Sequence, residues 1–338
     1  MKIIIISTIR NESDILETFV RYHLQLVDHM IIINHRSMDS SAKILNGLQQ
    51  EGLSLEVEDE SALDHQQGSV LTRYMRRAVR KYNADWVVPL DADEFLTVSG
   101  EGLVRKVMEK FPIDKVVKLQ WRTYIPTASD NCQEPNILKR IQHYRRNENH
   151  TLDKIMIPRS LALKNSGLIS PGNHGFVKKF SLKQKDFPYE YTDQLVLAHY
   201  PARSAQQIMT KAVVGWLACL SKPNKEPTEA FHLKQIYGHI KNGNLISPEE
   251  LSSMAMGYAT ATASAPPLEK DLVHMPIKFE AGHFPLHYVN TSTVNHFSVL
   301  AQMAEEFAEA LGALRRKQQR SAYDYFALLR RWLRFRRN

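Results

Sequence analysis

The chain is predicted to be an α/β protein with a doubly wound, mainly parallel sheet flanked by helices, and three observations predict this. Apolar runs rich in Ile and Val occur at residues 3–8, 29–34 and 86–90, with a shorter strand expected at 53–57. Segments with helical spacing of apolar residues lie between them, at 14–26, 42–50 and 69–82. Strands that alternate with helices, joined by right-handed crossovers, form this class of sheet.

The second half of the predicted sheet mixes strand directions. Residues 116–122 are a predicted strand, the run that begins at Gln194 is a predicted strand that ends in His199, and residues 154–163 form another extended region. Because no helical segments separate these strands, a mixed sheet is expected. A short helix over 100–111 and a long polar loop over 123–146 complete this half.

Length and composition exclude several classes of protein. The 338 residues, 43% of them hydrophobic, provide ample material for a packed core. The two cysteines, Cys132 and Cys219, match no metal-ligand spacing, which argues against a disulfide scaffold and fits a reducing compartment. The apolar start at 3–6 is too short for a signal peptide, and no stretch approaches the ~20 apolar residues that span a bilayer. A soluble or peripheral cytoplasmic protein is expected.

Three carboxylates, Asp91, Asp93 and Glu94, follow the strand at 86–90, where α/β sheets bind ligands. Asp91 and Asp93 stand at i and i+2, on the same side of an extended chain, and their charges repel unless a cation lies between them. Carboxylate oxygens suit Mg²⁺ or Mn²⁺, so the pair predicts a metal site for a diphosphate. A solvated loop or a helix cap is the alternative.

Two other polar loops are expected beside these carboxylates. Residues 10–13 follow the first strand and residues 35–41 follow the second. Because the carboxyl ends of parallel strands meet at one edge, all three loops should line one crevice.

These motifs together resemble family 2 type glycosyltransferases. The likeness consists of the Arg-Asn-Glu of 10–12, the segment 27–34 with Ser37 and Asp39, and the segment 85–96, and it covers roughly residues 1–100. The most similar branch is the bacterial one whose acidic motif is Asp-Ala-Asp-Glu-Phe. The resemblance implies a GT-A fold that binds a nucleotide-sugar at the carboxyl ends of the first strands.

The resemblance also implies roles for individual residues. Arg10, Asn11 and Glu12, with the loop from Asn34 to Asp39, would contact the nucleoside, and Asp91 and Asp93 would hold the metal that bridges the phosphates. Asn34 departs from the family, which usually has Asp there, so the expected contact to the base is in question.

A later segment resembles the same branch. His199-Tyr200-Pro201-Ala202-Arg203-Ser204 matches its His-Tyr/Phe-Pro-x-Arg-Ser run. A late histidine often completes the metal or diphosphate site in GT-A enzymes, so His199 is a predicted metal ligand. Arg203 and Lys211 are then candidates for donor-phosphate contacts, and His174 is a weaker candidate. A histidine packed after an apolar strand is the structural alternative for His199.

Further candidates rest on position alone. Gln67 and Arg73 lie at the helix before the acidic motif, where they could contact the donor, although a polar loop and a solvated helix face explain them as well. An inverting transferase needs a base for the acceptor hydroxyl, and Glu190 and Asp193 are the candidates. A retaining reaction would need no such base.

The chain is predicted to divide into a transferase domain at 1–220 and a mainly helical region at 221–338. Helices are expected at 231–241, 248–258 and 294–316, with a small-residue linker at 259–267 and a final Arg-rich helix. Aromatic residues interleaved with arginines suit an anionic membrane surface, while a packed helix with a solvated basic face is the alternative. No nucleic-acid motif accompanies the net charge of +8.

The sequence therefore predicts a metal-dependent glycosyltransferase that uses Mn²⁺ or Mg²⁺. Its donor would be a nucleotide-sugar and its acceptor a saccharide or lipid-linked saccharide, in surface polysaccharide assembly at the inner face of the membrane. A non-catalytic module that binds nucleotide-sugars or polyanions is the main alternative. A phosphohydrolase that uses the same carboxylates ranks last, because no phosphohydrolase motif is present.

Overall fold

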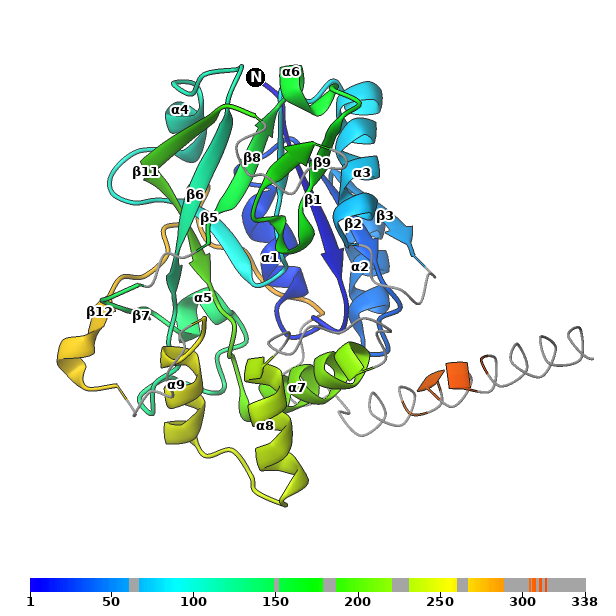
Figure 1. Cartoon of the computed structure of the whole chain (residues 1–338). Helices are drawn as coiled ribbons and strands as arrows, with labels where there is room; N and C mark the ends of the chain where they lie inside the picture. The colour runs from blue at the N-terminus through cyan, green and yellow to red at the C-terminus, as the bar shows by residue number, and fades with distance from the viewer. Residues whose placement is uncertain are drawn as a thin grey trace, which may run out of the picture.

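The computed structural model describes residues 1–60, 67–148, 152–178, 187–220, 231–259 and 267–288, together with residues 304, 306, 307, 310, 311 and 314. Eight strands in this part of the chain form one sheet in the order β3-β2-β1-β4-β8-β6-β11-β5 (Figure 1). In that order, they are Leu55–Asp59, His29–Asn34, Ile3–Ile9, Trp86–Pro89, Lys154–Pro158, Val116–Thr123, Tyr189–His199 and Glu94–Val98.

The first half of the sheet is parallel, as the sequence predicts. β1 pairs in parallel with β2 and β4, and β2 pairs in parallel with β3. The helices α1 (Leu16–His23), α2 (Ser41–Gln50) and α3 (Gln67–Tyr82) connect these strands. The first strand is buried on both faces, which explains its unbroken run of isoleucines. The first strands therefore end at one edge of the sheet.

The second half of the sheet is mixed, which confirms the prediction. β8 is antiparallel to β4 and β6, and β11 is parallel to β6 but antiparallel to β5. The extended region predicted at 154–163 is too long: β8 ends at Pro158, and Arg159–Ala162 form the helix α6. Pro158 is the last residue of β8 and the N-cap of α6, with extended backbone angles, and Leu161 then packs in the apolar layer beside α3.

Two other predicted segments differ from the structure. The helix expected at 100–111 is limited to α4, Val104–Met108. The loop expected at 123–146 contains the helix α5 (Ile137–Arg140) and the strand β7 (His143–Arg145). The Asn136 side chain caps α5, and β7 pairs with the distant strand β12 (Leu272–His274), a long-range contact that no local pattern indicates. A hairpin of β9 (Gly167–Ile169) and β10 (Phe176–Lys178) encloses the 3₁₀ turn η1 (Pro171–Asn173).

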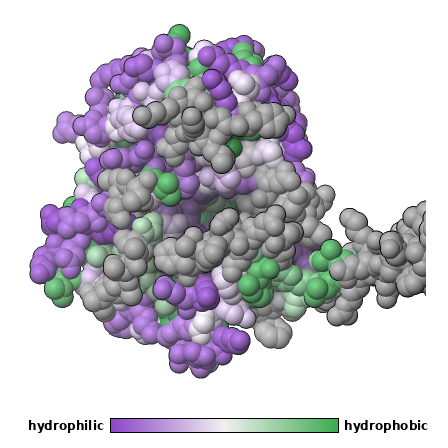
Figure 2. Space-filling model, viewed as in Figure 1, coloured by the Kyte–Doolittle hydropathy of each residue, from purple (hydrophilic) through white to green (hydrophobic). Residues whose placement is uncertain are grey.

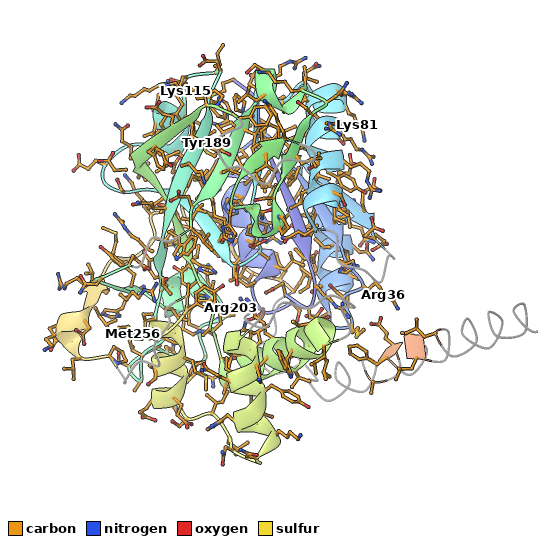
Figure 3. All side chains as sticks on the ribbon, viewed as in Figure 1. Arg36, Lys81, Lys115, Tyr189, Arg203 and Met256 are labelled. Carbon is orange, nitrogen blue, oxygen red and sulfur yellow. The ribbon has the colours of Figure 1, made fainter. Side chains whose placement is uncertain are left out.

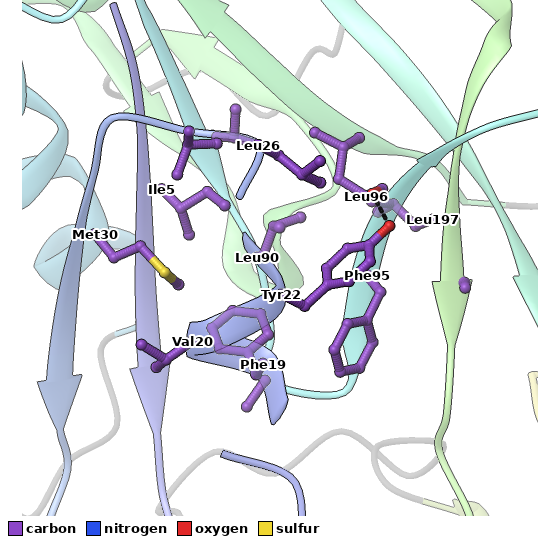
Figure 4. Close-up of a cluster of buried hydrophobic side chains, with 14 of the residues drawn as sticks. Ile5, Phe19, Val20, Tyr22, Leu26, Met30, Leu90, Phe95, Leu96 and Leu197 are labelled. Atoms are coloured by element: carbon purple, nitrogen blue, oxygen red, sulfur yellow. Dashed lines mark hydrogen bonds between the residues drawn. The ribbon is translucent and has the colours of Figure 1, made fainter. Parts of the chain in front are cut away.

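The core lies on both faces of the sheet. α1 and α2 cover one face, where Phe19, Tyr22 and Phe95 pack edge to face, and the hydroxyl of Tyr22 donates to the carbonyl of Leu96 at 2.9 Å (Figure 4). α3 covers the other face. On the face shown in Figure 2, the described residues are mostly hydrophilic, with a few hydrophobic residues among them.

The chain continues in three further helices, α7 (Ala205–Leu220), α8 (Phe231–Lys241) and α9 (Pro248–Met256), followed by the 3₁₀ turn η3 (Glu269–Asp271). Residues on both sides of position 220, including Ile208 and Ile236, share one apolar cluster, and the division at this position stays a prediction. The predicted linker and the last two predicted helices fall largely outside the described residues. Within the described residues, no helix combines the length and apolarity required to cross a membrane.

Candidate functional site

The three polar loops predicted to line one crevice lie at the carboxyl edge of the parallel strands. Arg203 follows β11 at this end of the molecule, while Lys115 and Tyr189 lie at the opposite end (Figure 3). β11 pairs with β5 so that His199 faces Glu94, which brings the end of β11 to the acidic motif. Two segments that are remote in the sequence thus meet at one edge.

The guanidinium of Arg203 joins three predicted motifs. Its Nε donates to Oδ2 of Asp14 at 2.7 Å, and Nη2 donates to Oε2 of Glu12 at 2.6 Å. Its Nη1 lies 3.7 Å from Oδ2 of Asp93, and the Arg203 side chain is only 1% exposed. Asp14 was missed from the sequence because it resembles an ordinary residue at the start of a helix. Its adjacency to the Arg-Asn-Glu motif is the signal that could have identified it.

Asp93 is surrounded by cationic and potentially cationic side chains. Nζ of Lys211 lies 2.9 Å from Oδ2, and Nε2 of His199 lies 3.7 Å from Oδ1. Burial alone raises the pKa of Asp93, but Lys211, His199 and Arg203 outweigh it and hold this pKa well below its usual value. Asp93 is therefore ionised. The structure brings it together with His199, Arg203 and Lys211, the three site residues predicted from the later part of the sequence.

Asp91 has different partners from Asp93. Nζ of Lys154 lies 2.7 Å from Oδ2 of Asp91 and 2.7 Å from Oε1 of Glu94. Burial lowers the pKa of Lys154, but the two carboxylates outweigh it, so the net shift is upward. Burial raises the pKa of Glu94 to about 7, against the pull of Lys154. Lys154 was missed from the sequence, where a lysine at the start of the apolar β8 run is its one signal.

Two amides complete the surroundings of Asp91. Nε2 of Gln67 and Nδ2 of Asn173 donate to its Oδ1 at 3.1 and 3.2 Å. Asn173 is fully buried, with a φ of 61°, and belongs to η1 in the β9–β10 hairpin. The predicted site residue Gln67 therefore lies in the site and holds the first aspartate of the motif.

The loops after β1 and β2 are joined by side-chain hydrogen bonds. Oδ1 of Asn11 accepts from the backbone N–H of Met38 at 2.7 Å, and the Asn11 N–H donates to Ser37 Oγ at 3.0 Å. The carboxylate of Asp39 accepts from the N–H groups of Ser13 and Ser41, each at 2.9 Å. Asn11 and Asp39 therefore fix the shape of the two loops.

Glu12 lies between these loops and Arg203. Burial raises the pKa of Glu12 to about 7, against the opposing effects of Arg203 and Lys211. Its backbone N–H donates to Ser41 Oγ at 3.1 Å. Glu12 therefore faces the same cluster as Asp93.

Asn34 is engaged at both ends of its amide. Nδ2 donates to Oδ1 of Asp59 at 2.9 Å, and Oδ1 accepts from the N–H of Ser37 at 3.3 Å. The carboxylate expected at position 34 is thus replaced by an amide that is bonded to a carboxylate from the end of β3.

Three predicted site residues are not brought to this cluster. Glu190 and Asp193 lie in the amino-terminal part of β11. The β6 partners of Glu190 and His199 are Val117 and Thr123, which are six residues apart and therefore separated by roughly 20 Å of strand. Glu190 instead pairs with Lys115 at 2.8 Å. Arg73 is 61% exposed and pairs with Glu60 at 2.7 Å on the outer surface of α3. The structure therefore does not support Glu190 or Asp193 as the base, nor Arg73 as a donor contact.

A divalent metal fits part of the cluster. Neighbouring ligands of an octahedral metal lie about 3.0 Å apart, and Asp93 Oδ1 and His199 Nε2 are 3.7 Å apart, so a movement of less than about 1 Å would bring this carboxylate and imidazole to neighbouring ligand positions. Asp91 does not complete a preformed triad, because Lys154, Gln67 and Asn173 bind its oxygens. Accordingly, the described residues contain no group of three or more His, Cys, Asp or Glu side chains placed to hold a metal.

Charge balance also favours a cation. Three aspartates, Asp14, Asp91 and Asp93, match Lys154, Arg203 and Lys211 in number, while burial raises the pKa of the two further carboxyl groups, Glu12 and Glu94, to about 7. A bound divalent cation would offset the cost of ionising Glu12 and Glu94 in a low dielectric.

No protein-family model and no curated protein matches this chain. Among solved structures it is similar to the crystal structure of S. aureus TarS 1-349, at 12% identity and a TM-score of 0.36 over 77% of this chain and 73% of that chain. It is also similar to the mannosyltransferase PcManGT from Pyrobaculum calidifontis, at 11% identity and a TM-score of 0.38 over 76% of this chain and 73% of that chain. A third is glucosyl-3-phosphoglycerate synthase from Mycobacterium tuberculosis, at 16% identity and a TM-score of 0.28 over 47% of this chain and 57% of that chain.

Several of these structures hold nucleotides and metals. The mannosyltransferase is in complex with GDP-Man and Mn²⁺, and a second structure of TarS is in complex with UDP. The synthase was crystallised with UDP and either Mn²⁺ or Mg²⁺.

Proposed function

We propose that this chain is a metal-dependent glycosyltransferase of the GT-A type. It would transfer a sugar from a nucleoside-diphosphate donor to a saccharide or lipid-linked acceptor. The observation that carries the proposal is the position of Arg203, whose guanidinium contacts Glu12 and Asp14 after β1 and lies 3.7 Å from Asp93 after β4. Three motifs that resemble one enzyme family in the sequence thus meet at the carboxyl edge of the sheet, where such sheets bind ligands.

The charged residues suit a diphosphate leaving group. Breaking the bond between the sugar and the diphosphate leaves negative charge on the phosphate oxygens, and fixed positive charge nearby stabilises it. Lys211 is 35% exposed and held by Asp93, so its ammonium lies at the boundary between the cluster and solvent. Arg203 is too buried to leave its carboxylates and instead holds the loops in place.

Asp93 and His199 are the residues that would hold Mn²⁺ or Mg²⁺, with phosphate oxygens as further ligands. When bound, the metal would supply Lewis-acid stabilisation of the leaving diphosphate. Gln67, Asn173 and Lys154 keep the carboxylate of Asp91 in one orientation beside this pair. Asn11, Glu12, Asn34 and Asp39 would form the nucleoside side of the site.

The acceptor and the cellular location extend this proposal. We assign a saccharide or lipid-linked saccharide of surface polysaccharide assembly as the acceptor, and the inner face of the membrane as the location. Support comes from the sequence of the C-terminal segment, where arginines alternate with aromatic residues. Binding of the full chain to anionic vesicles, compared with neutral vesicles, tests the location.

The test of the reaction is release of nucleoside diphosphate from a panel of nucleotide-sugars, with and without Mn²⁺. Slow transfer of the sugar to water makes the assay independent of the acceptor. We expect Mn²⁺-dependent release with donors of one base, lowered at least about 100-fold by Asp93→Asn because an amide holds Mn²⁺ far more weakly than the carboxylate that it replaces. Asp193→Asn is the matched control and should leave the rate unchanged.

The products distinguish the alternatives. Free sugar together with nucleoside diphosphate supports a transferase, whereas inorganic phosphate supports a phosphohydrolase. Binding of nucleotide-sugar without release, even when a mixture of saccharide acceptors is added, would contradict catalysis and favour a binding module.

A further inference from the structure

Two arginines at the carboxyl edge of the sheet converge on one carboxylate from the far end of the chain. Nη2 of Arg10 lies 3.2 Å from Oε2 of Glu306, and Nη2 of Arg36 lies 2.7 Å from Oε1. The three side chains are 23%, 29% and 16% exposed in that order. Figure 3 shows Arg36 at the same end of the molecule as Arg203. This arrangement is a two-arginine site for an anion.

The arginines are held in place by the strands that precede them. Ile9 and Asn34 are register partners at the ends of β1 and β2, and the N–H of His35 donates to the carbonyl of Ile9 at 2.9 Å. Arg36 has a φ of 55°, a conformation uncommon for a residue other than glycine. Arg10 and Arg36 therefore follow two strand ends that are held together by backbone hydrogen bonds, next to the proposed nucleotide site.

The anion in this structure leaves part of the site's capacity unused. Glu306 carries one negative charge against two guanidinium groups. Nε of Arg10 and Nδ2 of Asn11 are buried without a hydrogen-bond partner in the part of the chain that is described. A phosphate group carries up to two charges and more acceptor oxygens than a carboxylate, and arginine binds it in a bidentate manner. Phosphate therefore fits the site better than Glu306 does.

We propose that Arg10 and Arg36 form a phosphate-binding site that Glu306 occupies when no ligand is present. The identification of the phosphate as part of the nucleotide donor rests on the proposed function. Glu306 and the ligand then compete, so Glu306 lowers the apparent affinity of the site according to the fraction of time that its carboxylate occupies the two arginines.

The chain before Glu306 is anchored to α1 and α2, the two helices that follow the loops carrying Arg10 and Arg36. The N–H groups of His287 and Tyr288 donate to the carboxylate of Glu17 on α1, each at 2.7 Å. A Cβ at Gly47 of α2 would lie 2.5 Å from the ring of Tyr288, so this ring packs directly on the helix. Tethering of this kind raises the effective concentration of Glu306 at the arginines.

The test is calorimetric binding of inorganic pyrophosphate to the full chain, without metal. We expect Glu306→Gln to bind at least about threefold more tightly than wild type, because the competitor loses its charge. Glu305→Gln removes the same charge at the neighbouring position and should match wild type. Arg36→Gln should weaken binding, and adding Glu306→Gln to it should restore little, since the two residues act on one site.

Equal affinity of wild type and Glu306→Gln, or no binding to any variant, would overturn the proposal. The outcome is separate from catalysis, because pyrophosphate contains no sugar. Pyrophosphate binding that follows these expectations, in a protein that turns over no nucleotide-sugar, would keep this site and reject the transferase. Turnover of a nucleotide-sugar, with the same pyrophosphate affinity in wild type and Glu306→Gln, would keep the transferase and reject this site.

Discussion

Acidic and basic side chains meet at both ends of β11, but their exposure to solvent differs between the two ends. At its amino-terminal end Glu190 pairs with Lys115, and these side chains are 38% and 41% exposed. At its carboxyl end His199 and Arg203 meet Asp93, and all three side chains are 6% exposed or less. An acidic residue on a strand is therefore a weak predictor of a site, whereas buried charges gathered from several loops are a strong one.

The largest expected effect is at the buried end. Arg203→Met would leave Glu12 and Asp14 as buried carboxylates without their cation. We expect the free energy of unfolding to fall by about 3–5 kcal/mol, measured by urea unfolding at pH 8. Arg203→Lys keeps the positive charge but loses the forked guanidinium geometry. Its free energy of unfolding should lie between those of wild type and Arg203→Met. If Arg203→Met lost no more unfolding free energy than a substitution at an exposed position, the charges at the two ends of β11 would not differ in their contribution to stability.

The second effect concerns Lys154, which bridges Asp91 and Glu94. Lys154→Met should cost about 2–3 kcal/mol of unfolding free energy, below the usual range for a broken buried pair because Asp91 is 32% exposed and can turn toward water. Urea unfolding measures this loss, and Lys154→Arg is the charge-conserving control. A variant as stable as wild type would show that the bridge is not formed in solution.

A third effect is a pH dependence at the buried end. Burial raises the pKa of Glu94 to about 7, above its value of about 4.5 in the unfolded chain. Between these values the folded state binds the proton and the unfolded state does not, so Glu94 makes stability fall as pH rises from about 4.5 to about 7. Glu94→Gln should reduce this fall, measured as the melting temperature across that range in EDTA. An identical profile for both proteins would contradict the assignment.

The smallest effect is expected at the exposed end. Glu190→Gln removes an ion pair that solvent already screens, so the urea midpoint and the rate of nucleoside diphosphate release should both stay unchanged. A loss of activity with unchanged stability would restore Glu190 as a catalytic residue and would require a different arrangement of β11.

The fold could be predicted where strands are buried on both faces and short loops join them to helices. β1, β2 and β4 meet this condition, so their apolar runs alone located them. The insertion of β8 between β4 and β6 could not be predicted, because antiparallel pairing with remote strands leaves no local pattern. The role of Lys154 depends on that insertion and was missed with it.

Part of the candidate site could be predicted because some of its residues stand in recognisable sequence motifs. Asp93, His199 and Arg203 stand in motifs with a fixed order in the chain, and the structure brings them together. Glu190 and Asp193 lie close to His199 in sequence, but each residue of a strand advances the chain by about 3.3 Å. Both therefore lie in the amino-terminal part of β11, away from the cluster, and the catalytic base stays a prediction.

We propose above all that the carboxyl edge of the sheet binds a nucleoside diphosphate together with a divalent metal. A thermal-shift series with different nucleoside diphosphates, with and without Mn²⁺, measures this most directly in wild type and in Asp93→Asn. A ligand that binds only the folded state raises the melting temperature as its concentration exceeds the dissociation constant. We expect a Mn²⁺-dependent rise with one base in wild type and none in Asp93→Asn. No rise with any nucleotide in the folded wild type, or the same rise in both proteins, would contradict the claim.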